Sequence, residues 1–340
     1  MINIYDLSYE ELEEKLLEFG EKNFRCSQVW EWLYKHRVNS FGEMTNLSKD
    51  LIDKLENNFL FDYIEIVKKQ ENDLTNKYLF NLIDGNLIEA VLMKHDYGYS
   101  VCVSSQVGCN MGCAFCESGR LKKVRNLSTY EIVQQIILIE KDINRRIDSV
   151  VIMGIGEPFD NYDNIISFIK IINHVKGMQL GARHITVSTC GIIPKIREFS
   201  NLDLQVNLAI SLHAPNDEIR SKIMPINRAY PLNDLISELK RYIDKTNRRV
   251  TIEYVMLRGV NDSLDNAKEL SLLLKGMNVY VNLIPYNETS HIEYKRTSKD
   301  DIMKFYDMLK KNNINVTIRR EFGKGIDAAC GQLRAKEVNK

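Results

Sequence analysis

Residues 100–116, SVCVSSQVGCNMGCAFC, join a predicted strand to a metal-ligand pattern. The first part, SVCVSS, has the apolar and β-branched character of a strand. The second part spaces Cys109, Cys113 and Cys116 as C-x3-C-x2-C, so that three thiols fall within eight positions. Thiols this close together, in a chain with only seven cysteines, predict a metal centre just beyond the end of the strand.

A structural zinc site is one candidate, but such a site takes four Cys or His ligands that usually come in two separated pairs. The sequence offers no second pair, because His95, His184 and Cys190 are isolated from one another. A cluster of four irons explains the count differently, since three thiolates hold three irons and leave the fourth iron open to an exogenous ligand. We therefore expect an iron–sulfur cluster, with zinc as the alternative.

From about residue 100 onward, apolar strands alternate with amphipathic helices, which is typical of a parallel sheet with right-handed crossovers. The strand-like runs are SVVIMGIG, HITVSTCG, QVNLAISLH, RVTIEYVML and VYVNLIPYN, and the helical runs include STYEIVQQIILIEKDI and SLDNAKELSLLLKGM. Periodicity alone leaves an open sheet and a barrel both possible. In either fold, ligands bind at the carboxyl ends of the strands, where most of the unusual polar residues of these runs fall.

The chain before this region has two predicted parts. Residues 1–58 are expected to form short helices, the first of which starts with a capping box made by Ser8 and Glu11. Residues 59–95 are expected to form a β-hairpin linker, with the Asp84-Gly85 step as its turn. Residues 96–335 then form the parallel-sheet domain.

Composition and charge are those of an ordinary globular protein. The 340 residues are 44% hydrophobic and 27% charged with a formal net charge of zero, so an RNA-binding surface has to be a local patch. The acidic N-terminus does not resemble a secretory signal, and the apolar runs are far shorter than the roughly 20 residues of a membrane span. An odd number of cysteines indicates ligands or reactive thiols in a reducing compartment, and we expect a cytoplasmic protein.

The cysteine spacing, with Phe115 before the last cysteine, resembles that of the radical S-adenosylmethionine superfamily, and MGIGEP at residues 153–158 is similar to its methionine-binding motif. GIDAACGQL, residues 325–333, resembles the signature of the RlmN/Cfr group of RNA methyltransferases. CVSSQVGC, SLHAPND, PINRAYP, TIEYVML, GVNDS and NLIPYN match that group in the same order. The resemblance covers about residues 80–335 and implies an α/β fold, a partial (β/α)6 barrel behind a helical accessory domain and a β-linker.

The resemblance also implies roles for individual residues. A [4Fe-4S] cluster would be ligated by Cys109, Cys113 and Cys116, and S-adenosyl-L-methionine would be bound by Gly156, Glu157, Ser188, Ser211, Leu212, His213 and Asn287. Catalytic roles would fall to Cys330 as the S-methylcysteine intermediate, Cys102 as its resolving partner in a transient disulfide, and Glu89 as the proton acceptor. Each residue taken singly could be an ordinary core or strand-end residue, but the shared order of the motifs favours the functional roles.

The implied reaction is methylation of C2 of adenosine in the peptidyl-transferase centre of 23S rRNA, and of an adenosine in tRNA. One S-adenosylmethionine methylates Cys330, and a second is cleaved reductively to a radical that removes hydrogen from the new S-methyl group. The carbon radical adds to C2, Glu89 takes the C2 proton, and Cys102 attacks the Cys330 sulfur to free the methylated base. An electron donor such as flavodoxin or ferredoxin is implied, and we expect a monomer with no membrane partner.

Two alternatives stay open. Residues 117–128, ESGRLKKVRNLS, depart from the usual continuation of the group, and LKK resembles its Cfr-like branch, so methylation of adenosine C8 in 23S rRNA is the alternative within the enzyme class. A non-catalytic, metal-containing RNA-binding module is the alternative outside that class. RNA contacts are predicted for the basic residues beside the expected mouth of the site, namely Lys122, Lys123, Arg125, Arg319, Arg320 and Lys324.

Overall fold

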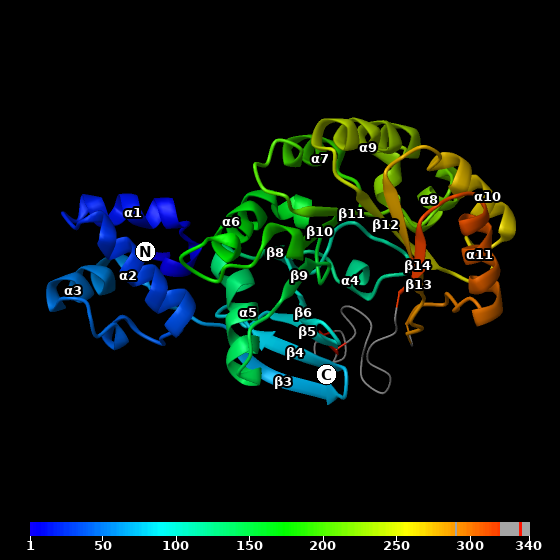
Figure 1. The fold of residues 1–340 in the computed structure, drawn as a ribbon. Helices are drawn as coiled ribbons and strands as arrows, with labels where there is room; N and C mark the ends of the chain where they lie inside the picture. The colour runs from blue at the N-terminus through cyan, green and yellow to red at the C-terminus, as the bar shows by residue number, and fades with distance from the viewer. Residues whose placement is uncertain (290, 320–332, 335–340) are drawn as a thin grey trace.

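The computed structural model describes residues 1–289, 291–319 and 333–334 (Figure 1). Cys330, Arg320 and Lys324 lie outside the described residues. A helical module at the N-terminus is followed by a large curved sheet with helices along its outer face (Figure 1). Within the described part of the chain, no helix is both long enough and apolar enough to cross a membrane.

The N-terminal module is built on α1 (Tyr9–Glu18), α2 (Asn23–Glu31) and α3 (Lys49–Asn58). The capping box predicted for α1 is confirmed, because the Ser8 hydroxyl accepts from the Glu11 N–H at 3.2 Å and the Glu11 carboxylate accepts from the Ser8 N–H at 2.7 Å. Short turns and one strand pair complete the module: η1 (Ile4–Asp6), η2 (Trp32–His36), η3 (Phe41–Glu43), β1 (Ile2–Asn3) and β2 (Phe59–Leu60).

Four antiparallel strands come next, namely β3 (Glu65–Asn72), β4 (Thr75–Asn81), β5 (Leu87–His95) and β6 (Gly98–Cys102). The predicted Asp84-Gly85 turn joins β4 to β5, and Gly85 has a φ of +79°, a left-handed conformation that favours glycine. This turn sets a register in which Lys77 lies opposite Val91 and Leu79 opposite Glu89. The antiparallel strands continue directly into the large sheet.

The large sheet has ten strands in the order β14-β13-β12-β11-β10-β9-β6-β5-β4-β3. The predicted six parallel strands of a partial barrel are confirmed, and they are β6, β9 (Ser149–Ile152), β10 (Ile185–Thr189), β11 (Asn207–Ser211), β12 (Val250–Met256) and β13 (Val279–Pro285). A short seventh parallel strand that the sequence analysis did not include, β14 (Val316–Ile318), pairs with β13. Three residues are too few for a periodic pattern to reveal a strand.

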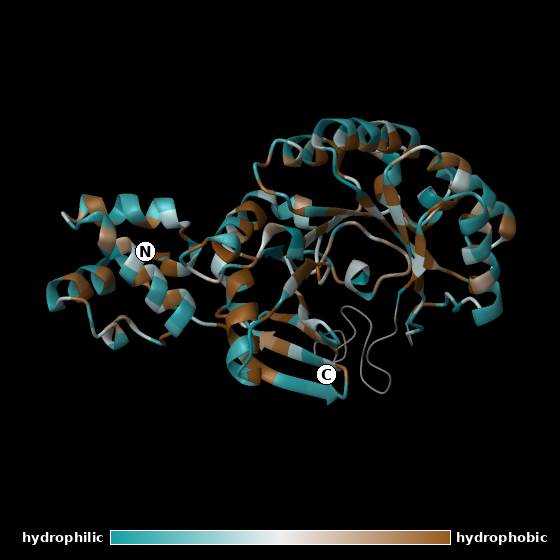
Figure 2. Cartoon of the chain, viewed as in Figure 1, coloured by the Kyte–Doolittle hydropathy of each residue, from teal (hydrophilic) through white to brown (hydrophobic). Residues whose placement is uncertain are grey.

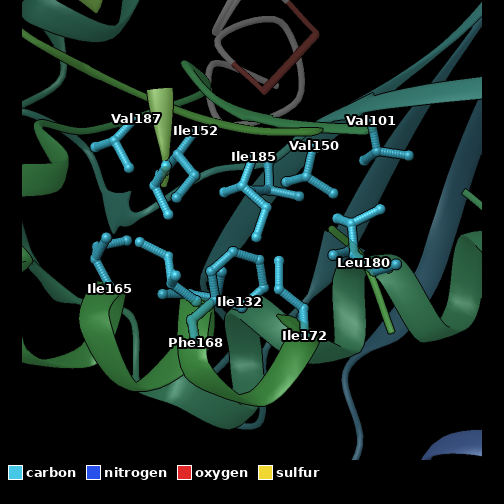
Figure 3. Close-up of a cluster of buried hydrophobic side chains, with 14 of the residues drawn as sticks. Val101, Ile132, Val150, Ile152, Ile165, Phe168, Ile172, Leu180, Ile185 and Val187 are labelled. Atoms are coloured by element: carbon cyan, nitrogen blue, oxygen red, sulfur yellow. The ribbon is translucent and has the colours of Figure 1, made fainter. Parts of the chain in front are cut away.

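Helices cover the outer face of the sheet with their apolar sides inward and their polar sides toward solvent (Figures 1 and 2). They are α5 (Thr129–Ile143), α6 (Tyr162–Asn173), α7 (Ile193–Phe199), α9 (Leu232–Thr246), α10 (Leu264–Leu273) and α11 (Lys299–Lys311), with the turns η4 (Pro158–Asn161), η5 (Ala182–His184) and η6 (Pro225–Arg228) between elements. Figure 3 shows one such layer, in which Val150 and Ile185 of the sheet face Phe168 of α6. Burial of each such side chain contributes roughly 1.5–3 kcal/mol to the free energy of folding.

Candidate active site

A cavity of about 380 Å³ opens at the carboxyl ends of the parallel strands, a size that suits a small cosubstrate. The predicted site residues that line it are Glu89, Cys102, Cys109, Cys113, Cys116, Gly156, Glu157, Ser188, Ser211, His213 and Asn287. Leu212 does not line the cavity, because its side chain is fully buried in the hydrophobic core. Cys330 is the predicted site residue that lies outside the described part of the chain.

The three clustered cysteines lie on a loop that is closed by a short antiparallel ladder between β7 (Gln106–Val107) and β8 (Arg125–Asn126). Gly108 has a φ of +80°, and a Cβ there would lie 2.2 Å from the Lys122 carbonyl oxygen, so this close approach of two backbone segments requires glycine. The Cys109 N–H donates to the Leu121 carbonyl at 3.0 Å. After the loop, the short helix α4 (Glu117–Arg120) leads to β8.

The environment of these thiols suits a multi-iron cluster. Burial raises the pKa of Cys109 to about 12, and burial together with the nearby Cys116 and Cys109 raises the pKa of Cys113 well above its usual range. Thiols in such surroundings become thiolates when a bound group brings positive charge, as iron does. The three thiols line one cavity, which is the donor set of a cluster that keeps one iron open, whereas structural zinc takes four ligands.

Glu157 stands on the turn after β9, as predicted. Gly154 allows this turn to pass the end of β6, because a Cβ there would lie 2.6 Å from the Val103 carbonyl oxygen. The Glu157 carboxylate is buried and accepts from the Cys190 N–H at 2.8 Å and from the Phe159 N–H at 3.0 Å. Burial raises the pKa of Glu157 in spite of these donors. A carboxylate has about four lone pairs, so Glu157 can still accept from an ammonium group in the cavity.

His213 is held by the backbone at the end of β11. Its Nδ1 accepts from the Val255 N–H at 3.0 Å, so that the neutral ring carries its proton on Nε2. Burial lowers the pKa of His213 to about 3, which keeps the ring neutral. The ring also meets the edge of Phe115, with 4.9 Å between the ring centroids. This contact joins the cysteine loop to the parallel strands. The part of the cavity lining at the ends of these strands is called the barrel wall below. Its residues are Gly156, Glu157, Ser188, Ser211, His213 and Asn287.

Strands β4, β5 and β6 form another part of the cavity lining, which we call the hairpin wall; its residues are Thr75, Glu89, Val91, Met93 and Cys102. Val91 pairs with Cys102 across β5 and β6, so Glu89, two residues earlier, lies diagonally from Cys102 on the same face. One Glu89 carboxylate oxygen lies 3.0 Å from the Lys77 ammonium. The other oxygen accepts from the backbone N–H of Arg334, which brings the chain four positions after Cys330 to this wall.

Sequence analysis missed two buried charged residues near this cavity. Lys77 is fully buried beside Glu89, and a hairpin turn at Asp84-Gly85 could have revealed it, since that turn sets residue 77 opposite residue 91. Glu253 on β12 lines the cavity and accepts from the Asn282 side-chain amide at 2.8 Å. The feature of the sequence that could have revealed Glu253 is that it is the single charged residue in the otherwise apolar and uncharged run TIEYVML.

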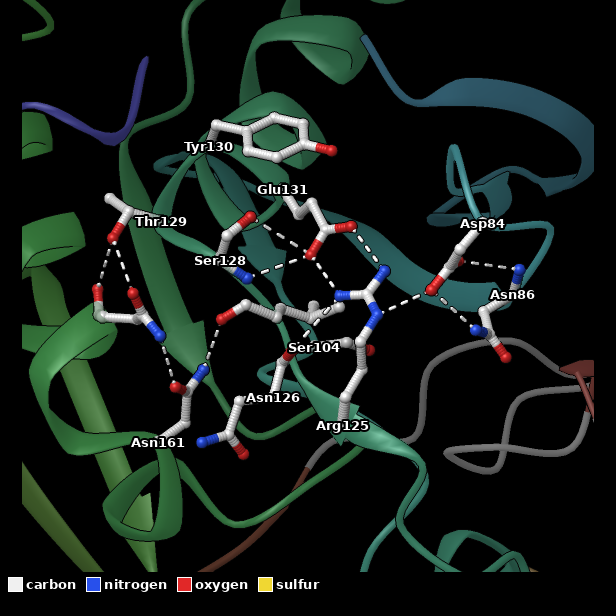
Figure 4. A network of polar contacts seen from close by, with 12 residues as sticks. Asp84, Asn86, Ser104, Arg125, Asn126, Ser128, Thr129, Tyr130, Glu131 and Asn161 are labelled. Atoms are coloured by element: carbon white, nitrogen blue, oxygen red, sulfur yellow. Dashed lines mark hydrogen bonds and ion pairs between the residues drawn. The ribbon is translucent and has the colours of Figure 1, made fainter. Parts of the chain in front are cut away.

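One predicted RNA contact, Arg125, is fully engaged within the protein (Figure 4). Its guanidinium donates to Asp84 at 2.6 Å and, through two nitrogens, to Glu131 at 2.7 and 2.8 Å. The bidentate geometry with Glu131 is the strong form of such a pair. Arg125 therefore links three parts of the fold: the hairpin turn, the end of the cysteine loop and the start of α5. These contacts give Arg125 a structural role.

The other described basic residues near the mouth differ from Arg125. Lys123 pairs with Asp160 at 2.7 Å and is half-buried. Lys122 is exposed, and Arg319 lines the cavity. Burial raises the pKa of the Cys102 thiol, and the positive charge of Arg319 is the largest effect that opposes this. Lys122 and Arg319 stay predicted RNA contacts.

Comparison with known proteins gives consistent results along the chain. The profile of the Radical SAM superfamily matches residues 103–271, and that of the ribosomal RNA large subunit methyltransferase N-terminal domain matches residues 2–60. A probable dual-specificity RNA methyltransferase RlmN of Acholeplasma laidlawii is 55% identical over 336 residues, covering 98% of this chain and 99% of the relative. The protein of the same name from Enterococcus faecalis is 55% identical over 347 residues, covering 99% and 97%. The crystal structure of a radical SAM methyltransferase from Sphaerobacter thermophilus superposes with a TM-score of 0.92 at 41% identity, covering 98% and 99% of the two chains.

Proposed function

The chain belongs to the RlmN family of radical S-adenosylmethionine RNA methyltransferases, and from that premise we propose that it methylates C2 of adenosine in 23S rRNA and in tRNA. The observation that carries this proposal is that one cavity gathers the three cysteines of the loop with Glu89 and Cys102 of the hairpin wall. The words "dual-specificity" in the names of the relatives support two RNA substrates.

The family implies an iron–sulfur cluster and S-adenosylmethionine, and we assign a [4Fe-4S] cluster to Cys109, Cys113 and Cys116. When bound, these groups supply the radical that starts the reaction and require an external electron donor such as flavodoxin or ferredoxin. The barrel wall holds the cosubstrate, with the Glu157 carboxylate accepting from its ammonium group. Leu212 can contribute through its main chain, because its side chain belongs to the core.

The hairpin wall performs the steps on the RNA base in this proposal. Cys330 carries the methyl group to C2, and Glu89 removes the C2 proton as a general base. The Cys102 thiolate then attacks the Cys330 sulfur: an S–S bond forms, the bond from that sulfur to the transferred carbon breaks, and the carbon keeps the electron pair and takes up a proton, so that the methylated base leaves. Cys102 has to lose its proton first, and the positive charges of Arg319 and Lys77 favour that loss against the effect of burial on its pKa.

Both alternatives have less support. Methylation at C8 is not favoured, because relatives 54–55% identical over nearly the whole chain carry the RlmN name. A non-catalytic RNA-binding module gives no reason for a buried carboxylate and a further cysteine that line one cavity together with the three thiols.

The test is the product of the reaction. Anaerobically reconstituted protein should convert a 23S rRNA fragment and tRNA, with S-adenosylmethionine and a reductant, to RNA that contains C2-methyladenosine. Mass spectrometry of digested nucleosides against C2 and C8 standards identifies the methylated atom. C8-methyladenosine would replace the proposal by the C8 alternative, and cluster-loaded protein without any methylated adenosine would contradict both.

A further inference from the structure

Lys77 and Glu89 form an ion pair inside the hairpin wall. The Lys77 side chain is 0% exposed and the Glu89 side chain 3% exposed, with 3.0 Å between Nζ and the carboxylate oxygen. In the register of β4 and β5, Leu79 lies opposite Glu89, so Lys77 is its diagonal neighbour on the same face. Two strands of one hairpin therefore place an ammonium beside a carboxylate that lines the cavity.

Stability gives a poor reason for this pair. Removing two charges from water costs about as much free energy as their attraction returns, and apolar side chains of similar volume often serve as well or better. A buried charged residue that lines a cavity, as Glu89 does, is a candidate for a functional role. The Lys77–Glu89 pair therefore points to a chemical task.

The Glu89 carboxylate is fixed on more than one side before any substrate binds. The Lys77 ammonium pairs with one carboxylate oxygen of Glu89, and the backbone N–H of Arg334 donates to the other. The main chain is fixed as well, because the Glu89 carbonyl accepts from the Ser104 hydroxyl at 2.6 Å. A carboxylate offers about four lone-pair sites, so contacts of this kind do not prevent an oriented Glu89 from accepting a proton.

A neighbouring hydroxyl indicates that this wall receives a polar ligand. Thr75 lies two residues before Lys77 on β4, lines the cavity and is 3% exposed. Among the described residues, its hydroxyl has no hydrogen-bond partner. A buried polar group without a partner costs about 1–3 kcal/mol, which a ligand that meets it recovers. An adenine offers ring-nitrogen acceptors beside C2.

We propose that Lys77 is a positioning residue of the methyl transfer: its ammonium holds the Glu89 carboxylate in an ion pair and aims it at the C2–H bond. The inference rests on the proposed function, in which Glu89 removes that proton. In this step the C2–H bond breaks, an O–H bond forms on Glu89, and the electron pair of the C–H bond returns to the adenine ring.

The test compares Lys77→Met with the conservative Lys77→Arg and with Lys94→Met, which changes an exposed lysine of β5. Lys77→Met should lower the rate of RNA methylation about 10- to 100-fold, as loss of a group that orients a catalytic residue commonly does. S-methylation of Cys330, which needs neither Lys77 nor Glu89, should continue at the wild-type rate. Lys77→Arg should recover much of the RNA methylation, and Lys94→Met should match the wild type.

An isotope effect separates positioning from a purely structural role. With RNA deuterated at adenosine C2, Lys77→Met should show a larger primary kinetic isotope effect than the wild type, because proton removal has become the slow step. A structural defect would slow S-methylation of Cys330 together with RNA methylation and would leave the isotope effect unchanged, which would overturn the inference. Lys77→Met at the full wild-type rate would overturn it too. If the wild type itself makes no C2-methyladenosine, the proposed function fails, and that result is visible before any variant is tested.

Discussion

The two walls of the cavity hold their charged and titratable groups in different ways. On the barrel wall, Glu157 and His213 are both met by backbone N–H groups at strand ends. On the hairpin wall, Glu89 has a buried side-chain partner, the Lys77 ammonium, in addition to the backbone N–H of Arg334. Backbone donors come with the fold itself, whereas a buried side-chain partner has to be placed by particular residues. We infer that the barrel wall serves the cosubstrate that the superfamily shares, and the hairpin wall the chemistry on the base.

The largest effect is expected from Cys113→Ala, which should disable the cluster and leave the hairpin wall in place. Three thiolates are the smallest set that holds such a cluster with one open iron, so the variant should lose bound iron and cleave S-adenosylmethionine only at background level. Iron analysis and the yield of 5′-deoxyadenosine measure both effects. The matched control is Cys26→Ala, since Cys26 is a buried cysteine of the N-terminal module. Full iron content in Cys113→Ala would refute the ligand assignment.

Cys102→Ala should impair the function of the hairpin wall and leave that of the cluster and the barrel wall intact. The barrel wall and cluster stay intact, so Cys330 should still be methylated and should still attack RNA, but the adduct should not resolve. The expected product is protein joined to RNA through a thioether, which thiol reductants do not cleave. Gel analysis under reducing conditions detects it, and Cys330→Ala serves as the control that forms no adduct. Normal turnover by Cys102→Ala without any adduct would show that Cys102 is only packed core.

Glu157→Gln should have a smaller effect that is confined to the barrel wall. A hydrogen bond to a charged group contributes about 1.5–3 kcal/mol, so S-adenosylmethionine should bind roughly 10- to 100-fold more weakly. Equilibrium binding to cluster-loaded protein measures this, with Glu218→Gln, an exposed position of α8 (Asp217–Ile223), as the control. Unchanged affinity in Glu157→Gln would mean that the carboxylate does not touch the cosubstrate.

An effect on stability rather than on binding or turnover is expected from pH, through His213. The folded ring has a pKa of about 3, whereas histidine in an unfolded chain titrates near 6.5. Above about pH 6.5 the His213 ring is neutral in both the folded and the unfolded state, so its protonation does not lower the free energy of unfolding. As the pH falls toward 3, only the unfolded state takes up the proton, so the free energy of unfolding should drop by about 1.4 kcal/mol per pH unit. Denaturant unfolding of the apo-protein should show this extra slope relative to His213→Gln, and equal slopes would contradict it.

Features that depend on near neighbours in the chain could be predicted from the sequence. The Ser8–Glu11 capping box and the turn at Gly85 both formed as expected, because each is fixed by residues within one turn. The parallel strands followed from their apolar runs, and the polar residues at their ends met in one cavity as the fold requires.

Features that depend on distant partners were missed. Period-two alternation alone tells which side of a strand Lys77 faces; its position beside Glu89 depends also on the register that the Asp84-Gly85 turn sets, and this register was not used in the prediction. For Arg125, which was predicted to contact RNA, a basic residue in a loop did not reveal the two carboxylates that its guanidinium binds. Leu212 stays a predicted cosubstrate contact, and its sequence position between Ser211 and His213 did not show that its side chain packs in the core.

The Arg125 bridge has a consequence for the order in which the cavity is assembled. Its bond to Glu131 spans 6 positions of the chain, and its bond to Asp84 spans 41. Closing the longer loop costs roughly 1.7 kcal/mol more in chain entropy, so we expect the short contact to form first during folding. The cysteine loop is then organised against α5 while the hairpin is still undocked. At that stage the side of the cavity that the hairpin later forms is still open. Iron can then reach the three thiols before the hairpin docks and brings Glu89 into position.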